Sequence, residues 1–149
     1  MKDQELFRIL CNYLPYGLNF ENNGEIFLLL QLNVYYDQKP MQVEGYSETL
    51  QEIRAIFLEG CKPILHSLSD LTKEIEHNGE KFVPIEKLIQ LAECGHDKSI
   101  ITLVDNGSID AEACIELTYG LISKLIEWHF DVFGLIPQGK AIDINTLEL

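Results

Sequence analysis

Histidine and cysteine are the side chains here that could bind a transition metal, and the chain has four of each. No two of them lie at a ligand spacing such as i, i+3 or i, i+4, or within a C-x₂₋₄-C loop. The closest pair, Cys94 and His96, straddles Gly95 at a predicted helix end. His129 lies among apolar residues and is predicted to be a hydrogen-bonded histidine at the edge of the core. We therefore predict no metal ion and no cofactor, and a zinc site built from distant residues is the less favoured alternative.

Serine near histidine is the pattern that could support nucleophilic catalysis, and Ser67 and Ser69 follow closely after His66. Neighbouring residues of an extended segment point to opposite sides, however, and Ser69 fits a helix cap better. The chain contains no G-x-S-x-G motif and neither of the common glycine-rich phosphate-binding loops. We predict no catalytic residue, and a small enzyme whose site is assembled from distant residues remains an alternative.

Four carboxylates define the first candidate protein-contact surface. Their spacing in the sequence matches steps of three or four residues along a helix. They are Glu112, Glu116, Glu127 and Asp131. On a helix they fall on one stripe, together with Gly120 and Ser123. A general acid–base pair needs a cleft and unequal environments, which a solvated ridge does not supply. The stripe is therefore either a wetted face or a negative ridge that fits a basic groove on a partner.

Three tyrosines form the second candidate contact surface: Tyr35, Tyr36 and Tyr46. They lie, with Met41, at or near a predicted hairpin whose strand becomes half exposed. Aromatic residues and methionine are enriched in interface cores, which favours a contact surface. Packing under an adjacent helix explains them equally well.

The net charge of −13, from 24 acidic and 11 basic residues, restricts the classes of partner. Direct binding to nucleic acid is not expected, because that affinity comes from clustered Lys and Arg. A partner with a basic surface fits the charge, although dispersed acidic residues also simply maintain solubility. The first residues resemble no signal peptide, no apolar run approaches a membrane span, and the cysteines are far apart, so we expect a cytoplasmic protein with free thiols.

The elements that must position these residues are predicted from hydrophobic periodicity. A helix over 110–133 is apolar around most of its circumference, so other elements must cover it. Residues 26–36 alternate as a strand, and 41–44 form its hairpin partner. The first half of that strand is expected to be covered on both faces and the second half on one only. Residues 47–59 fit either a helix capped by Ser47 or a strand, and the helix is preferred. Further helices are expected after Asp3 and from Pro84, and strands at 100–104 and 141–144.

These elements and the length of 149 residues predict a single domain over 1–149. The expected fold class is α+β, with a small, mainly antiparallel sheet packed by helices around one long C-terminal helix. Homo-oligomers are possible in this arrangement, because apolar surface is expected on the half-exposed strand.

Two stretches of the sequence carry a resemblance. One is 62–65 (KPIL) followed by 68–75 (LSDLTKEI), and the other is 128–136 (WHFDVFGLI) followed by Gly139 and 141–145 (AIDIN). Both resemble segments of small uncharacterised proteins encoded by phages and prophages of Bacteroidota. The step at 14–18 (LPYGL) is a weaker match. The resemblance covers about a third of the chain and implies a mobile-element origin. It brings no activity and no functional residues.

Charge, missing catalytic motifs and this resemblance together favour a non-enzymatic interaction protein of phage or prophage origin. Its partner would be a host nucleic-acid-processing or defence enzyme, of CRISPR type for example, which an acidic protein could inhibit by binding. A self-associating structural module is the alternative that differs most from it.

Overall fold

The computed structural model describes residues 3–33, 41–94 and 119–147, and its largest element is a six-stranded sheet. The sheet order is β4-β3-β2-β1-β5-β8. Its strands are β1 (Asn19–Asn22), β2 (Glu25–Asn33), β3 (Gln42–Ser47), β4 (Glu52–Phe57), β5 (Lys62–Leu65) and β8 (Ile142–Asp143). Every neighbouring pair is antiparallel except β5 and β8, which run parallel. A separate hairpin joins β6 (Ile75–His77) to β7 (Glu80–Phe82).

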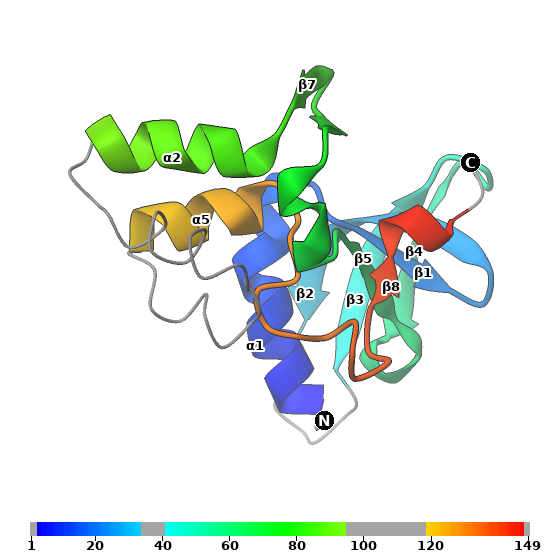
Figure 1. Cartoon of the computed structure of the whole chain (residues 1–149). Coiled ribbons are helices and arrows are strands. Elements are labelled where there is room, and N and C mark those ends of the chain that lie inside the picture. Colours follow the sequence, from blue (N-terminus) through cyan, green and yellow to red (C-terminus); the bar gives the residue numbers. More distant parts are fainter. Residues whose placement is uncertain (1–2, 34–40, 95–118, 148–149) are drawn as a thin grey trace.

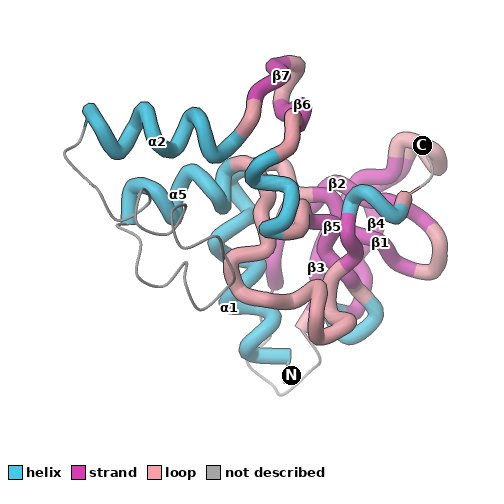
Figure 2. Tube along the Cα trace, viewed as in Figure 1, coloured by secondary structure: helices cyan, strands magenta, loops and turns pink. Residues whose placement is uncertain are grey.

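In the described part of the chain, three α-helices lie to one side of the sheet, as Figures 1 and 2 show. They are α1 (Asp3–Tyr13), α2 (Pro84–Cys94) and α5 (Tyr119–Glu127). Short 3₁₀ helices are interspersed among these elements: η1 (Leu14–Tyr16), η2 (Leu58–Gly60), η3 (Leu68–Thr72) and η4 (Ile144–Thr146). The predicted α+β class and the mainly antiparallel sheet are therefore confirmed. The predicted strand at 100–104 lies outside the described residues.

The long C-terminal helix is not observed, because α5 spans 9 residues and ends at Glu127. His129 takes a left-handed backbone conformation with φ 62°, which terminates the helix. Phe130 then forms a parallel bridge to His66: His66 N donates to His129 O at 2.8 Å, and Asp131 N donates to His66 O at 2.9 Å. Pairing with the end of β5 therefore replaces the last turns of the predicted helix. Residues 110–118 lie outside the described part of the chain.

The preference for a helix over 47–59 was wrong, because this segment forms the turn after β3 and then β4. Ser47 accepts a hydrogen bond from Leu50 N at 3.1 Å inside that turn, and Gln51 has φ 55°. Six residues of β4 pair in unbroken register with β3, from Ser47↔Glu52 to Gln42↔Phe57. Cross-strand pairing thus decides between two local patterns that the sequence satisfies equally.

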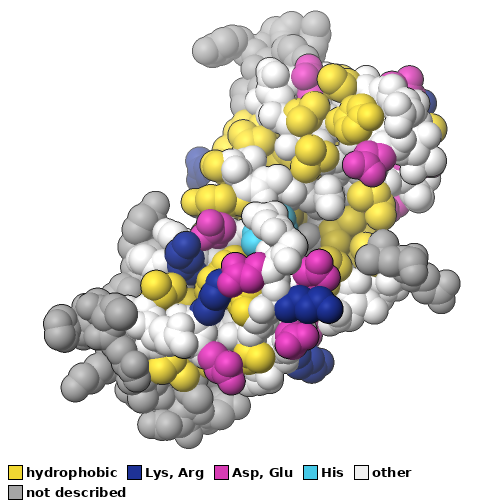
Figure 3. Space-filling model, turned by 90° about the horizontal axis from the view of Figure 1, so that it is seen from above, with side chains coloured by type: hydrophobic (Ala, Val, Ile, Leu, Met, Phe, Trp, Pro, Cys, Tyr) yellow, Lys and Arg dark blue, Asp and Glu magenta, His cyan; other side chains and the backbone are white. Residues whose placement is uncertain are grey.

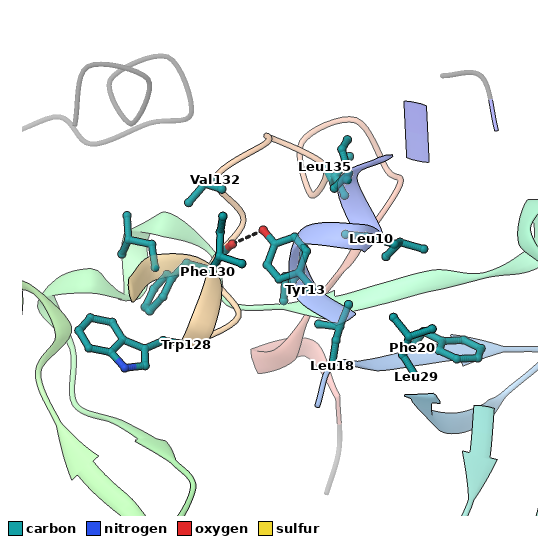
Figure 4. Packing of buried hydrophobic residues seen from close by; sticks show 14 of the residues in the cluster. Leu10, Tyr13, Leu18, Phe20, Leu29, Trp128, Phe130, Val132 and Leu135 are labelled. Carbon is teal, nitrogen blue, oxygen red and sulfur yellow. Dashed lines mark hydrogen bonds between the residues drawn. The ribbon is translucent and has the colours of Figure 1, made fainter. Parts of the chain in front are cut away.

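The buried cluster draws side chains from α1, the sheet and the segment around α5 (Figure 4). Tyr13 lies at its centre, where its hydroxyl donates to the Phe130 carbonyl at 2.5 Å. Gly45 allows β3 to pack closely, since a Cβ there would lie 2.7 Å from Phe27 Cβ and from Phe20 Cζ. Cys61 is buried and Cys11 exposed; burial, aided by Glu21, raises the pKa of the Cys61 thiol to about 12.

Candidate functional site

An uncovered sheet face is the feature of this structure that most resembles a binding surface. On β2, Phe27 and Leu29 point into the core, and the side chains between them point outward. The register aligns Leu28 with Tyr46 on β3 and Tyr46 with Ile53 on β4. We call the resulting set the apolar strip: Ile26, Leu28, Leu30, Tyr46, Ile53 and Phe57.

The strip is unusually exposed for its composition. The exposed fractions are 62% for Ile53, 57% for Phe57, 44% for Leu30, 39% for Ile26 and 37% for Leu28. A β-bulge between Leu29 and Gln31 leaves Leu30 unpaired and turned outward. Single exposed apolar residues are ordinary, whereas adjacent ones across three strands mark interaction surfaces.

The strip corrects one expectation and locates one candidate residue. The first half of the strand 26–36 was expected to be covered on both faces, yet the described structure leaves its outer face open. Tyr46, a predicted contact residue, lies half-buried in the middle of the strip. Tyr35 and Tyr36 lie outside the described residues.

Strand β4 closes one edge of the sheet, and its surroundings are acidic. In the described part of the chain, β3 is the one strand paired with it. Residues 42–60 contain four glutamates and one arginine, a net charge of −3. That arginine, Arg54, is engaged by Glu52, two residues earlier on the same strand. An approaching partner therefore meets apolar side chains bordered by negative charge.

The predicted acidic ridge is not observed as one surface. Glu127 is partly exposed and pairs with Lys124 at 2.8 Å, so its charge is compensated. Asp131 is 3% exposed and therefore belongs to no contact surface, contrary to prediction. Glu112 and Glu116 lie outside the described residues. The predicted ridge thus contributes one described, compensated carboxylate, and the apolar strip has replaced it as the stronger candidate.

Asp131 has a structural position that explains its burial. Its two carboxylate oxygens accept hydrogen bonds from Leu135 N at 2.7 Å and from Ile136 N at 2.8 Å. Burial raises the pKa of this carboxyl, and the N–H donors of Ile136, Leu135 and Gly134 act in the opposite direction. The side chain therefore holds the turn after the Phe130 bridge in place.

A cleft of about 450 Å³ lies between the β6–β7 hairpin, α2 and α5. Its aromatic wall is Phe82 with Trp128, whose ring centroids are 5.0 Å apart. Two lysines of the lining are already paired: Lys87 with Glu80 at 2.6 Å, and Lys124 with Glu127.

In Figure 3 hydrophobic side chains gather over one half of the visible face of the molecule, and acidic and basic side chains intermix over the other half.

His77 also lines the cleft, and the sequence analysis assigned it no role. Burial lowers its pKa, and the nearby Glu127 carboxylate opposes that shift. Its ring lies edge-on to His129, with centroids 5.0 Å apart. His129 Nε2–H donates to the Tyr16 carbonyl at 2.6 Å, which confirms the predicted hydrogen-bonded histidine at the core edge.

A second polar cluster, also missed from the sequence, contains His66 and Asp70, which are both buried. His66 Nδ1 lies 3.6 Å from Asp70 Oδ2, beyond hydrogen-bonding distance. Burial lowers the pKa of His66, and the charge of Asp70 opposes this shift. Asn145 Nδ2 donates to Asp70 at 2.7 Å and so ties η4 to η3. The i, i+4 spacing of His66 and Asp70 was the feature of the sequence from which this cluster could have been predicted.

The serines beside His66 do not form a catalytic dyad with it. Their hydroxyls lie 3.0 Å apart and are bonded to each other. Ser67, rather than the predicted Ser69, caps η3 by accepting from Ser69 N. Across the residues that the structure describes, no group of three or more His, Cys, Asp or Glu side chains is arranged to hold a metal ion.

Comparison with known proteins adds nothing to these observations. No family model, no curated protein and no solved structure matches the chain. Among the helices of the described residues, none has both the length and the apolar composition to cross a membrane. The function must therefore be argued from the surfaces themselves.

Proposed function

We propose that this chain is a non-enzymatic protein-binding protein, and that it contacts its partner through the apolar strip. The observation that supports this most directly is the exposure of five aliphatic and aromatic side chains across β2 and β4, with Tyr46 between them. Interface cores are rich in such side chains and poor in charged ones. The strip supplies an apolar centre, and the glutamates around it supply a charged rim.

The proposed partner has a basic surface. The chain has a net charge of −13, and the glutamates near β4 would speed encounter with a positive protein and orient it. Host enzymes that process nucleic acid expose basic grooves for their substrate. With the mobile-element origin implied by the resemblance, this supports an inhibitor of a host nucleic-acid-processing or defence enzyme, acting in the cytoplasm.

Affinity capture from a bacterial host lysate tests the proposal. The wild-type chain is compared with the double variant I53S/F57S, which removes the most exposed part of the strip. A matched control is L91S, because Leu91 is an exposed apolar residue (42%) on α2, away from the strip. We expect wild type and L91S to retain a basic protein that I53S/F57S does not retain. High salt should weaken this retention. Equal retention by all three proteins, or no retention at low salt, would contradict the proposal.

A second candidate function, a small enzyme with a site assembled from distant residues, is supported by the cleft. His77 and Glu127 come from different elements and line the same hollow as Trp128. With its lowered pKa, His77 is neutral at pH 7 and able to accept a proton. Trp128 is the single tryptophan of the chain, so its fluorescence reports ligands entering the cleft. A screen of small metabolites that leaves this fluorescence unchanged would remove this candidate.

A further inference from the structure

The backbone of β4 has a definite orientation toward the open side of the sheet. Leu58 N donates to Met41 O at 3.0 Å, and this pair continues the unbroken β3–β4 register. In an antiparallel ladder, alternate residues direct both N–H and C=O to the same neighbour. Glu52, Arg54 and Ile56 therefore face β3, as Leu58 does. Ile53, Ala55 and Phe57 direct their N–H and C=O groups away from it.

This edge lacks most of the features that normally protect a sheet edge. Natural edges carry lysines, prolines, bulges or covering segments. Strand β4 contains neither lysine nor proline, its pairing with β3 has no bulge, and its one cation is engaged by Glu52. Among the described residues no strand pairs with its outer side, although the Phe57 carbonyl accepts a hydrogen bond from Cys61 Sγ at 3.4 Å. The N–H and C=O groups of Ile53 and Ala55 and the N–H group of Phe57 thus face the open side, where a further strand could pair.

We propose that the edge of β4 binds an extended segment of the partner by strand addition, a mode that rests on the proposed protein-binding function. The segment's backbone would pair with Ile53, with Ala55 and with the N–H group of Phe57. Apolar or aromatic side chains on one face of the segment would extend the apolar strip beside Ile53 and Phe57. Lysine or arginine at the remaining positions would meet the net charge of −3 on residues 42–60.

A second copy of this chain is the competing occupant, and charge disfavours it. Each copy has a net charge of −13, and two copies would bring the same acidic edge together. Pairing two short strands alone also gives less contact area than the roughly 800 Å² per partner of a standard interface. An extended segment with positive charges avoids the first problem and needs less area, because weak and transient complexes use small interfaces.

Ala55 provides the variant that separates strand addition from contact with the strip. Because its N–H points away from β3, A55P removes no ladder hydrogen bond while blocking an added strand. The matched control A55V keeps the N–H and favours strand geometry. Circular dichroism and thermal unfolding verify that both variants remain folded. Hydrogen exchange at the Ala55 amide of the wild-type chain gives a second measurement that needs no variant.

The probe is a bead-bound library of random peptides about nine residues long, the length of an ordinary strand. We expect wild type and A55V to select peptides in which apolar residues alternate with Lys or Arg. We expect A55P to bind these peptides at least about tenfold more weakly. Addition of a selected peptide should slow exchange at the Ala55 amide. Selection of peptides without this alternation, or equal binding by A55P, would overturn strand addition.

The remaining outcomes distinguish this inference from the proposed function. If I53S/F57S loses a lysate partner that A55P retains, the strip binds proteins and strand addition is wrong. If neither variant changes capture, the proposed function itself fails. Sedimentation velocity tests whether a second copy of the chain occupies the edge. If wild type forms a dimer and A55P is a monomer, the edge binds a second copy, and the proposal of a basic partner segment is wrong.

Discussion

The Tyr13 hydroxyl donates a hydrogen bond to the Phe130 carbonyl at 2.5 Å, and both residues are completely buried. This bond joins the last turn of α1 to the segment that follows α5. The Tyr13 ring also lies edge-on to Phe133, with centroids 6.1 Å apart. The Tyr13 side chain therefore links α1 to the segment that follows α5.

The first prediction concerns this hydrogen bond. Y13F keeps the ring and removes the donor, which leaves the Phe130 carbonyl buried without that bond. We expect the free energy of unfolding to fall by about 1–3 kcal/mol. Urea denaturation followed by tryptophan fluorescence measures it. Y16F is the control, since Tyr16 is 38% exposed and should change stability little; equal effects of the two variants would contradict the assigned role.

The second prediction concerns pH. Burial lowers the pKa of His129 to about 4 from an ordinary value of 6.5, and the pKa values of His66 and His77 are also lowered. The unfolded chain therefore binds protons at a higher pH than the folded chain does. Stability is fully present above pH 6.5 and is lost as the pH falls toward 4, with a contribution from His129 on the order of 2 kcal/mol.

Urea denaturation between pH 7.5 and 4.5 measures this dependence. In H129N the slope below pH 6.5 should decrease, because asparagine tolerates the left-handed backbone and does not titrate. Acidic residues also titrate at the lower end of this range. The informative quantity is therefore the difference between H129N and wild type in the slope of the free energy of unfolding against pH. An unchanged slope in H129N would show that other groups determine the acid response.

The third prediction concerns Asp131. D131N replaces one of two accepting oxygens by an amide donor, which would then face the backbone N–H of Leu135 or Ile136. We expect a loss of about 1–3 kcal/mol in the free energy of unfolding. E127Q is the control, because the Glu127–Lys124 pair is partly exposed and worth less than about 1 kcal/mol. If both variants behaved alike, the buried position of Asp131 would be wrong.

Asp131 also shows where sequence reasoning fails. Glu127 and Asp131 are spaced for one helix face, and local periodicity contains no sign that the helix stops between them. The stop depends on pairing of Phe130 with His66, a contact between distant parts of the chain. The same limit applies to β4, where Ile53 and Phe57 fit a helix and a strand equally. By contrast, strict alternation over several residues of β2 was enough to predict that strand.

The candidate surface was anticipated in part, through Tyr46 and through the apolar surface expected on the strand 26–36. Exposure of Ile53 and Phe57 could not be predicted, because apolar residues are ordinarily assigned to the core. Whether a face of a sheet is covered depends on where the helices pack, which a single strand does not encode. The cleft beside Trp128 is likewise formed by elements separated along the sequence, so none of its lining residues stands out alone.

The last prediction tests the close packing that separates the two faces of the sheet. On its inner side β3 carries Gly45, opposite Leu29 on β2 and Arg54 on β4. Phe20 and Phe27 stack there, with centroids 5.4 Å apart and an interplanar angle of 16°. In G45A the new methyl group would lie 2.7 Å from Phe27 Cβ, which the backbone holds in place.

Because the sheet must shift to admit that methyl group, we expect G45A to lower the free energy of unfolding by about 1–3 kcal/mol. G120A is the matched control: outside its own helix backbone, an added Cβ there meets no atom of the described residues within 4 Å, and alanine favours the α5 helix. Urea denaturation should therefore show a lower free energy of unfolding than wild type for G45A and a higher one for G120A. The strip should respond too, since displacement of β3 changes the alignment of Tyr46 with Leu28 and Ile53. If G45A were as stable as wild type and kept its binding, the contact of Gly45 with both rings would be disproved.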